Sequence, residues 1–171
     1  ITGKMWAFQN YSVVSDVNKK KKKAQVCGIL ASKTKLDEVE HHVFAESSRI
    51  NSTFGGNFID MLRFQLVLEI IEKENLLENV QKQGEYLLEG LQKFQAKFPH
   101  LISNARGRGL MCAFDLPDGK ARADFQEKLF EENVIVLICG EKSIRFRPHL
   151  NVTQEDLQFA LDKIEKIASN Y

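Results

Sequence analysis

The sequence predicts an α/β protein in which a small β-sheet is backed by helices. Residues 110–168 alternate between strand-like and helix-like segments in the order β-α-β-β-α, without an internal repeat. Two long helix-like stretches precede them, at residues 58–71 and 77–98. The chain has 171 residues, of which 43% are hydrophobic and 27% charged, which excludes disordered and collagen-like classes.

The first third of the chain predicts one buried strand and one short helix. Residues 26–31, Val-Cys-Gly-Ile-Leu-Ala, form a continuous apolar run that is typical of a buried strand. Apolar residues recur at helix-like spacing over residues 36–44. The turn-rich segment 51–57, Asn-Ser-Thr-Phe-Gly-Gly-Asn, then leads into a helix.

The two long helices differ in their apolar pattern. Over residues 58–71 apolar side chains occupy nearly every side of the helical wheel, which a surface helix would not tolerate. We expect this helix to be covered, between two domains or at a subunit contact. Residues 77–98 instead place their apolar side chains on one face and stop before Pro99, as an amphipathic helix does.

The C-terminal third predicts the β-α-β-β-α unit itself. The expected elements are a strand at 110–116, a turn at 117–119, a helix at 121–132, a strand at 134–138, a turn at 139–142, a strand at 143–147 and a last helix. That last helix carries a capping signature, with Thr153 as N-cap and Asp156 three residues later.

Charge and cysteine content narrow the function classes. Lys and Arg number 24 against 23 Asp and Glu, a net charge of +1, which argues against a protein that covers nucleic-acid phosphates. Cys27, Cys112 and Cys139 lie far apart among apolar neighbours, as reduced buried thiols do, and no zinc-ligand spacing occurs. The histidines have no nearby ligand set, so we expect no metal. With neither a leader nor an apolar run long enough for a membrane span, we predict a cytoplasmic protein.

Three segments could carry chemistry. The lysine run 19–23 could contain a Schiff-base nucleophile or form a basic surface loop. Ser52 and Thr53, followed by two glycines and a helix start, suit a phosphate, although an ordinary helix N-terminus has the same pattern. Arg145 and Arg147 alternate with apolar residues in a short strand, so both face one side and could bind a carboxylate or form surface salt bridges. Residues 106–109, Arg-Gly-Arg-Gly, are interpreted as a turn into the strand that follows.

These segments together resemble the C-terminal part of a class III, fold-type-I pyridoxal-phosphate aminotransferase. The resemblance covers essentially the entire chain, and the order and spacing of its motifs are more specific than any one of them. It is carried by residues 1–8, 22–28, 51–57, 106–112 and 144–148. Within the family, the Lys-Lys-x-Gln-Val-Cys-Gly segment is most similar to that of L-lysine 6-aminotransferases, followed by 4-aminobutyrate aminotransferases.

The resemblance implies a role for residues in two of these motifs. Lys22 would form the Schiff base with pyridoxal 5'-phosphate and then act as general base and acid, with Lys23 as the adjacent alternative. Thr53, assisted by Ser52, would bind the cofactor phosphate of the neighbouring subunit.

The resemblance also implies the substrates and the assembly. Arg145 would bind the substrate α-carboxylate, and Asn51 would contact substrate. The reaction would move the ε-amino group of L-lysine to 2-oxoglutarate, in a homodimer, without nucleic acid or membrane as partners. The alternatives are a 4-aminobutyrate or ornithine aminotransferase, or a non-catalytic remnant that acts as an interaction module. A ferredoxin-like nucleic-acid module, recruited by the lysine run, is a third reading that the balanced charge disfavours.

The domain organisation follows from the same comparison. Residues 1–56 would be the C-terminal end of the cofactor-binding large domain, and residues 57–171 a long linking helix and a small domain with a short, largely antiparallel sheet. We expect the aspartate that pairs with the pyridine nitrogen, the phosphate loop and the ring-stacking aromatic residue to precede residue 1, and this piece alone to be inactive. The sequence departs from the family at residues 18–21, where an apolar strand is replaced by Asn-Lys-Lys-Lys.

Overall fold

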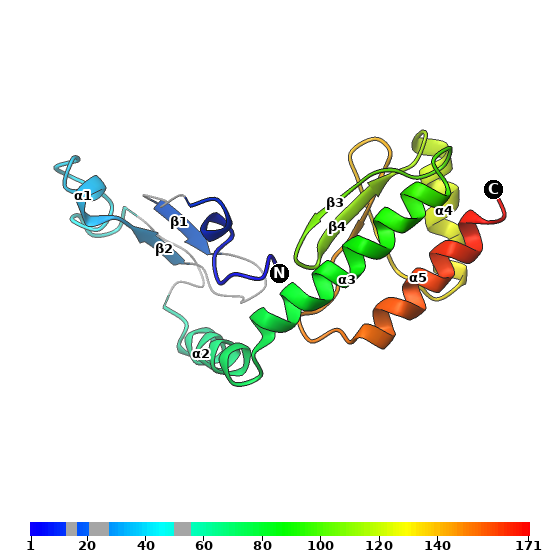
Figure 1. Cartoon of the computed structure of the whole chain (residues 1–171). Helices are drawn as coiled ribbons and strands as arrows, with labels where there is room; N and C mark the ends of the chain where they lie inside the picture. Colours follow the sequence, from blue (N-terminus) through cyan, green and yellow to red (C-terminus); the bar gives the residue numbers. More distant parts are fainter. Residues whose placement is uncertain (13–16, 21–27, 50–55) are drawn as a thin grey trace. The chain divides into compact units, whose positions relative to one another are not determined.

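The computed structural model describes residues 1–12, 17–20, 28–49 and 56–171 of the chain (Figure 1). These residues form two compact units. One consists of Ile1–Met5 with Asn75–Tyr171, here called the C-terminal unit, and the other of Trp6–Glu74, here called the N-terminal unit. The predicted assignment of residues 1–56 and 57–171 to two domains of a larger enzyme stays a prediction.

The N-terminal unit contains a two-stranded sheet and one long helix. Its elements are the 3-10 turn η1 (Ala7–Asn10), β1 (Val17–Lys20), β2 (Gly28–Ala31), α1 (Lys33–Leu36) and α2 (Phe58–Lys73). The antiparallel pair joins Val17 to Ala31 and Lys20 to Gly28, so the part of the lysine run that the structure describes, Lys19 and Lys20, lies in a strand. The predicted strand at 26–31 is found at its described part, Gly28–Ala31.

Two predictions for this unit have different outcomes. The helix expected at 36–44 is wrong, because α1 ends at Leu36 and the residues that follow form turns. The apolar residues at helical spacing, such as Val39 and Val43, are exposed and so gain no burial from a helix. The helix expected at 58–71 is found as α2, and Asn57 caps it by accepting hydrogen bonds from the backbone N–H of Ile59 and Asp60.

The C-terminal unit is a four-stranded antiparallel sheet with helices on one face. The elements in chain order are α3 (Leu76–Lys97), β3 (Ser103–Arg108), β4 (Met111–Asp115), α4 (Gly119–Glu131), β5 (Leu137–Cys139), β6 (Ser143–Phe146) and α5 (Gln154–Ala168). The strand order is β3-β4-β6-β5, with antiparallel neighbours throughout. Helix α3 packs on β3 and β4, α4 packs on β5 and β6, and α5 packs against both helices (Figure 1). The predicted small, antiparallel, helix-backed sheet is confirmed.

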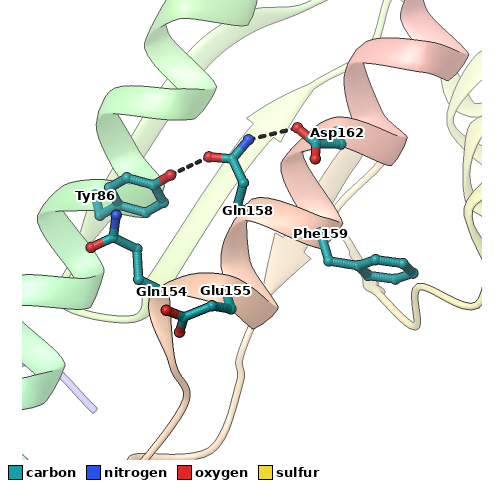
Figure 2. Close-up of a pocket in the computed structure, with 6 residues that line it drawn as sticks. All are labelled: Tyr86, Gln154, Glu155, Gln158, Phe159 and Asp162. Carbon is teal, nitrogen blue, oxygen red and sulfur yellow. Dashed lines mark hydrogen bonds between the residues drawn. The ribbon is translucent and has the colours of Figure 1, made fainter.

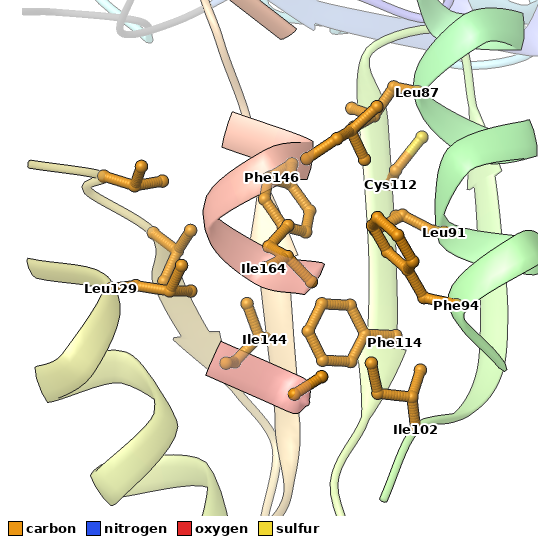
Figure 3. Packing of buried hydrophobic residues seen from close by; sticks show 14 of the residues in the cluster. Leu87, Leu91, Phe94, Ile102, Cys112, Phe114, Leu129, Ile144, Phe146 and Ile164 are labelled. Carbon is orange, nitrogen blue, oxygen red and sulfur yellow. The ribbon is translucent and has the colours of Figure 1, made fainter. Parts of the chain in front are cut away.

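Alternation along β4 and β6 sorts their side chains between the two faces of the sheet. Phe114 of β4 and Ile144 of β6 are fully buried beneath the helices. The Phe114 ring lies 5.9 Å from that of Phe125 of α4 and 6.0 Å from that of Phe146, measured between centroids. Figure 3 shows this cluster, completed by Leu87 and other apolar residues of α3 and α5. The residues that alternate with the buried ones along these strands, including Ala113 of β4 and Arg145 of β6, point to the opposite face of the sheet.

Strand β3 was not expected. The Arg-Gly-Arg-Gly segment predicts a turn, but the structure places Arg106, Gly107 and Arg108 in a strand paired with β4. The turn is shorter and consists of Gly109 and Leu110, with Gly109 at a φ of +55° that glycine adopts without strain. An edge strand that is exposed along most of its length needs no apolar pattern, which is why the sequence gives no signal for it.

The first residues of the chain are fixed to the C-terminal unit by backbone contacts. The N–H of Leu110 donates to the carbonyl of Ile1 at 3.0 Å, and the Gln81 side chain of α3 donates to the carbonyl of Gly3 at 2.9 Å. Residues 1–5 therefore belong with the C-terminal unit, which resumes at Asn75. No helix in the described ranges is both long and apolar enough to cross a membrane.

Candidate functional site

The sheet face opposite the helices brings together two arginines, Arg106 and Arg145, of which the sequence predicts Arg145 as a site residue. Register across the sheet aligns Arg106 of β3 with Ala113 of β4, Ala113 with Arg145 of β6, and Arg145 with Leu137 of β5. We call this surface the arginine face, defined by Arg106, Ala113, Asp115, Leu137, Ser143 and Arg145. Since adjacent strands lie about 4.8 Å apart, the Cα atoms of the two arginines are separated by about 10 Å.

Arg145 is the residue on this face with an unused donor. Its side chain is half-buried, and its Nε is buried without a hydrogen-bond partner in the part of the chain that the structure describes. An unpaired buried donor is costly, so such a group is expected to meet a ligand or another part of the protein. Arg147, the other arginine of the predicted pair, follows the end of β6 and is exposed. The structure therefore distinguishes the two arginines that the sequence pattern treats alike.

Arg106 is fully engaged by a polar cluster in the next row of the sheet. Its Nη1 donates to Asp115 Oδ1 at 2.8 Å and its Nη2 to Ser143 Oγ at 3.1 Å. Asp115 also accepts from Ser143 Oγ at 2.5 Å and from Asn104 Nδ2 at 2.9 Å. Three side chains thus converge on a single buried carboxylate.

This arrangement keeps Asp115 ionised. Burial by itself would raise the pKa of its carboxyl group, because a charge is disfavoured away from water. The hydrogen bonds from Ser143, Asn104 and Arg106, together with the positive charge of Arg106, outweigh burial and lower this pKa from 3.8 to about 2. The ion pair with Arg106 is therefore present at every pH at which the protein would work.

Sequence reasoning missed Asp115 and Ser143. The available signal is an acidic residue in an otherwise apolar strand, Met-Cys-Ala-Phe-Asp-Leu, at the alternation position that Ala113 also occupies. Its partners come from two other strands, and only the register of the sheet brings them together.

The remaining predicted site residues, Lys22 with its alternative Lys23, Asn51, Ser52 and Thr53, lie outside the described residues. Their proposed roles stay predictions. Of the predicted site residues, Arg145 is the one that the structure describes.

The described thiols have different surroundings. Cys112 is buried, its Sγ donates to the carbonyl of Gly109 at 3.3 Å, and burial raises its pKa to about 12, so it stays a protonated, unreactive thiol. Cys139 is free and half-buried rather than fully buried. Cys27 lies outside the described residues. Among the described His, Cys, Asp and Glu residues, no group of three could hold a metal ion.

A concave surface elsewhere in the C-terminal unit lies between α3 and α5 and has a volume of about 440 Å³ (Figure 2). The Tyr86 hydroxyl and the Gln158 side chain are hydrogen-bonded there, and Gln158 donates to Asp162 at 2.6 Å. The lining residues are Tyr86, Gln154, Glu155, Gln158, Phe159 and Asp162. None of these six is cationic and two are acidic, so the groove has no positive charge to pair with a carboxylate, and the arginine face is the better candidate.

The Aminotransferase class-III family matches residues 1–168, and the chain therefore belongs to this family. Its fold agrees with that assignment: the chain superposes on lysine aminotransferase from M. tuberculosis with a TM-score of 0.91 and 42% identity, covering 96% of this chain and 38% of that one. The predicted family and fold-type-I class are confirmed.

Curated relatives narrow the likeness further. The chain is 44% identical to the L-lysine-epsilon aminotransferase of Amycolatopsis lactamdurans over 165 residues, which is 96% of this chain and 36% of that protein. It is 35% identical to the mitochondrial 4-aminobutyrate aminotransferase of Mus musculus over 151 residues, 87% of this chain and 29% of that protein. The chain thus spans about a third of the length of the relatives it matches.

Proposed function

We propose that this chain is the C-terminal portion of a pyridoxal-phosphate-dependent aminotransferase that moves the ε-amino group of L-lysine to 2-oxoglutarate. The higher identity to L-lysine-epsilon aminotransferases than to 4-aminobutyrate aminotransferases supports lysine as the donor. The structural observation that carries the proposal is the placement of Arg145 on the sheet face away from the core, with a buried Nε that has no hydrogen-bond partner among the described residues. Both substrates of the proposed reaction carry an α-carboxylate, and a guanidinium binds such a group through two parallel hydrogen bonds.

The chemistry of the predicted donor set fits the cofactor. An amine such as that of Lys22 reacts with an aldehyde, and the hydroxyl groups of Ser52 and Thr53 are suitable donors to a phosphate. When bound, pyridoxal phosphate withdraws electrons from the carbon that bears the amino group. Lys22 would hold the cofactor through its Nζ, and would then use the same atom to take a proton from the donor carbon and return it during transfer.

Arg145 would orient the substrates in this scheme. With the α-carboxylate fixed at the arginine, the distal amino group of lysine is directed away from the sheet and towards the reacting centre. The neighbouring Ala113 and Leu137 are uncharged and do not compete for the carboxylate. Asn51 would make a further substrate contact. The homodimer of the complete enzyme and the cytoplasmic location belong to the same proposal.

The direct test uses the whole protein that contains this chain. L-lysine labelled with ¹⁵N at its ε-position is supplied with 2-oxoglutarate and cofactor, and the label is followed into glutamate. We expect transfer of the ε-label and none of an α-label, and slower transfer from ornithine and 4-aminobutyrate. Faster transfer from either competitor would reassign the donor, and no transfer from any of the three would contradict an aminotransferase.

A variant pair links this activity to Arg145. Replacement of Arg145 by Gln removes two charge-assisted hydrogen bonds, together worth about 2–3 kcal/mol, so KM for lysine and for 2-oxoglutarate should both rise roughly 30- to 150-fold. Lys142→Gln removes one positive charge from the exposed turn before β6 and should leave both KM values unchanged. Equal effects of the two substitutions would show that general charge, rather than Arg145, attracts the substrates.

We further propose that the 171-residue chain alone has no aminotransferase activity. It spans 36% of the L-lysine-epsilon aminotransferase it resembles, and the resemblance implies that the groups around the pyridine ring lie in the rest of that enzyme. Turnover by the purified chain would contradict this.

The second candidate function is a non-catalytic interaction module. The observation that favours it is α2, an apolar helix on which none of the side chains is buried. Its exposed large apolar residues are Phe58, Ile59, Met61, Leu62, Leu66 and Ile70. A whole protein that associates through α2 but transfers no amino group would support this alternative.

A further inference from the structure

The arginine face holds two guanidinium groups that could approach the same anion. Arg106 and Arg145 flank Ala113 in one row across three strands, and the side chain between them is a single methyl group. Two long, flexible cations on either side of so small a residue can both reach the space above it. A carboxylate bound there could therefore be held by one arginine or by both.

The structure separates the two arginines by their partners. Arg106 turns towards the next row, where its guanidinium is held by Asp115 Oδ1 at 2.8 Å, by Ser143 Oγ at 3.1 Å and by the carbonyl of Asn104 at 2.9 Å. Arg145 has a buried Nε that no described residue satisfies. Arg106 is thus occupied and Arg145 is available.

Asp115 has the position and charge to maintain this difference. Its side chain is 11% exposed, whereas that of Arg106 is 44% exposed, so the carboxylate is the more buried partner of the pair. Ser143 donates to the same carboxylate and stands two residues before Arg145 on β6. The cluster therefore holds Arg106 on the far side of Ala113 from Arg145, which it leaves free.

We propose that Asp115 is a positioning residue that withholds Arg106 from the substrate, so that Arg145 alone of this pair binds the carboxylate. The inference rests on the proposed function, because it assumes that Arg145 is the carboxylate-binding group. It gives Asp115 a role in the choice between monocarboxylate and dicarboxylate ligands. With one free guanidinium, the face binds one carboxylate, and the second carboxylate of a dicarboxylic acid gains little there.

Removal of the Asp115 charge should change this selectivity. In Asp115→Asn, Arg106 loses its anionic partner and can turn towards Ala113, which gives the face two cations. A dicarboxylate probe such as glutarate should then bind about three- to tenfold more tightly, while butyrate, with one carboxylate, should gain less than twofold. In the reverse change, Arg106→Gln, the unpaired Asp115 anion should attract Arg145 and weaken glutarate binding.

The test uses the whole protein that contains this chain and the ¹⁵N resonances of arginine Nε, which report each guanidinium separately. Glutarate and butyrate are the probes, titrated into the wild type and the two variants. In the wild type, both probes should shift the Arg145 signal and leave the Arg106 signal in place. In Asp115→Asn, glutarate should shift both signals.

Glu132→Gln is the matched control. Glu132 is also ionised and paired, to Lys163 and Lys166 of α5, and its pKa is lowered to about 2 by hydrogen bonds from these lysines. Its substitution alters net charge by the same amount as Asp115→Asn without releasing an arginine on the sheet. It should leave both affinities and both arginine signals as in the wild type.

The outcomes separate this inference from the proposed function. A wild-type Arg106 signal that shifts with Arg145, or an Arg106 that ignores glutarate in Asp115→Asn, overturns the positioning role while Arg145 keeps its assignment. An Arg145 signal that no probe shifts in any variant overturns the Arg145 assignment itself. If Asp115→Asn is unfolded, as loss of its dispersed amide spectrum would show, the Arg106→Gln variant provides the test instead. Glutarate binding to Arg106→Gln that is unchanged or tighter than in the wild type would contradict the inference.

Discussion

A close approach between helix α3 and the turn at Gly109 gives a stability prediction with an unusual sign. Gly84 lies in the middle of α3, where replacement of Gly by Ala usually stabilises a helix by about 1 kcal/mol. A Cβ at this position would lie 2.3 Å from the carbonyl carbon of Gly109 and 2.5 Å from its Cα and its oxygen. All three atoms belong to the backbone, so no side-chain rotation can make room.

The expected loss follows from the required movement. Ordinary van der Waals contact begins at 3.4 Å, so α3 and the turn must separate by about 1 Å. The turn cannot simply retreat, because a Cβ on Gly109 would itself meet the Ile1 carbonyl oxygen at 2.4 Å, which shows how closely the N-terminal segment packs behind it. Overpacking of this kind costs about 1–3 kcal/mol or more. We therefore expect Gly84→Ala to lower the free energy of unfolding by about 2 kcal/mol.

Gly90→Ala in the same helix is the control. Its Cβ would meet Leu161 Cδ1 at 2.7 Å and Cδ2 at 2.8 Å, the ends of a flexible side chain that can rotate away. The free energy of unfolding should change by less than about 1 kcal/mol in this variant. Urea unfolding followed by circular dichroism measures both, with equal m-values as evidence for a common unfolded state. A Gly84→Ala chain as stable as the wild type would refute the close packing.

Three further predictions concern single residues. The pKa of Asp115 is lowered on folding from 3.8 to about 2, so its ionised carboxylate should add about 2 kcal/mol to the free energy of unfolding. This contribution should be complete above pH 3.8 and be lost as the pH falls through 2. Acid unfolding of Asp115→Asn compared with the wild type measures it. Thr153→Ala removes the capping box that joins Thr153 to Asp156 and should cost about 1 kcal/mol in urea unfolding, whereas an unchanged midpoint would show that the cap is dispensable. Cys112, with a pKa of about 12, should resist iodoacetamide at pH 8 in the folded chain and react after unfolding, as peptide mass spectrometry would show.

Local sequence patterns predict much of the C-terminal unit, because its helices have clear apolar periodicity and capping residues. The apolar periodicity of residues 77–98 corresponds to α3, and the spacing of Thr153 and Asp156 marks the start of α5, where both hydrogen bonds of the capping box are formed. Strand β3 carries no comparable signal, because an exposed edge strand buries little. The helix predicted at 36–44 does not form, although its apolar residues have helical spacing. Val39 and Val43 are exposed, so a helix there would not bury them.

In the candidate site, too, local sequence patterns predict some features, whereas others depend on how the strands pair. Alternation along β6 is a local pattern, and it correctly places Arg145 on the face away from the core. The engagement of Arg106 by Asp115 depends on the pairing of β3 with β4 and of β4 with β6, including a register shift between Ser103 and Arg106. No local pattern in the sequence specifies such a register. The distinction between an occupied and an available arginine is therefore a property of the fold.

The central claim is that this chain supplies the cofactor-binding lysine of an aminotransferase. The most direct measurement treats the whole protein, loaded with pyridoxal 5'-phosphate, with borohydride, and then maps the labelled peptide. We expect a phosphopyridoxyl group on Lys22, and a label on Lys23 would move the site by one residue. Absence of label throughout the lysine run 19–23 would contradict the claim.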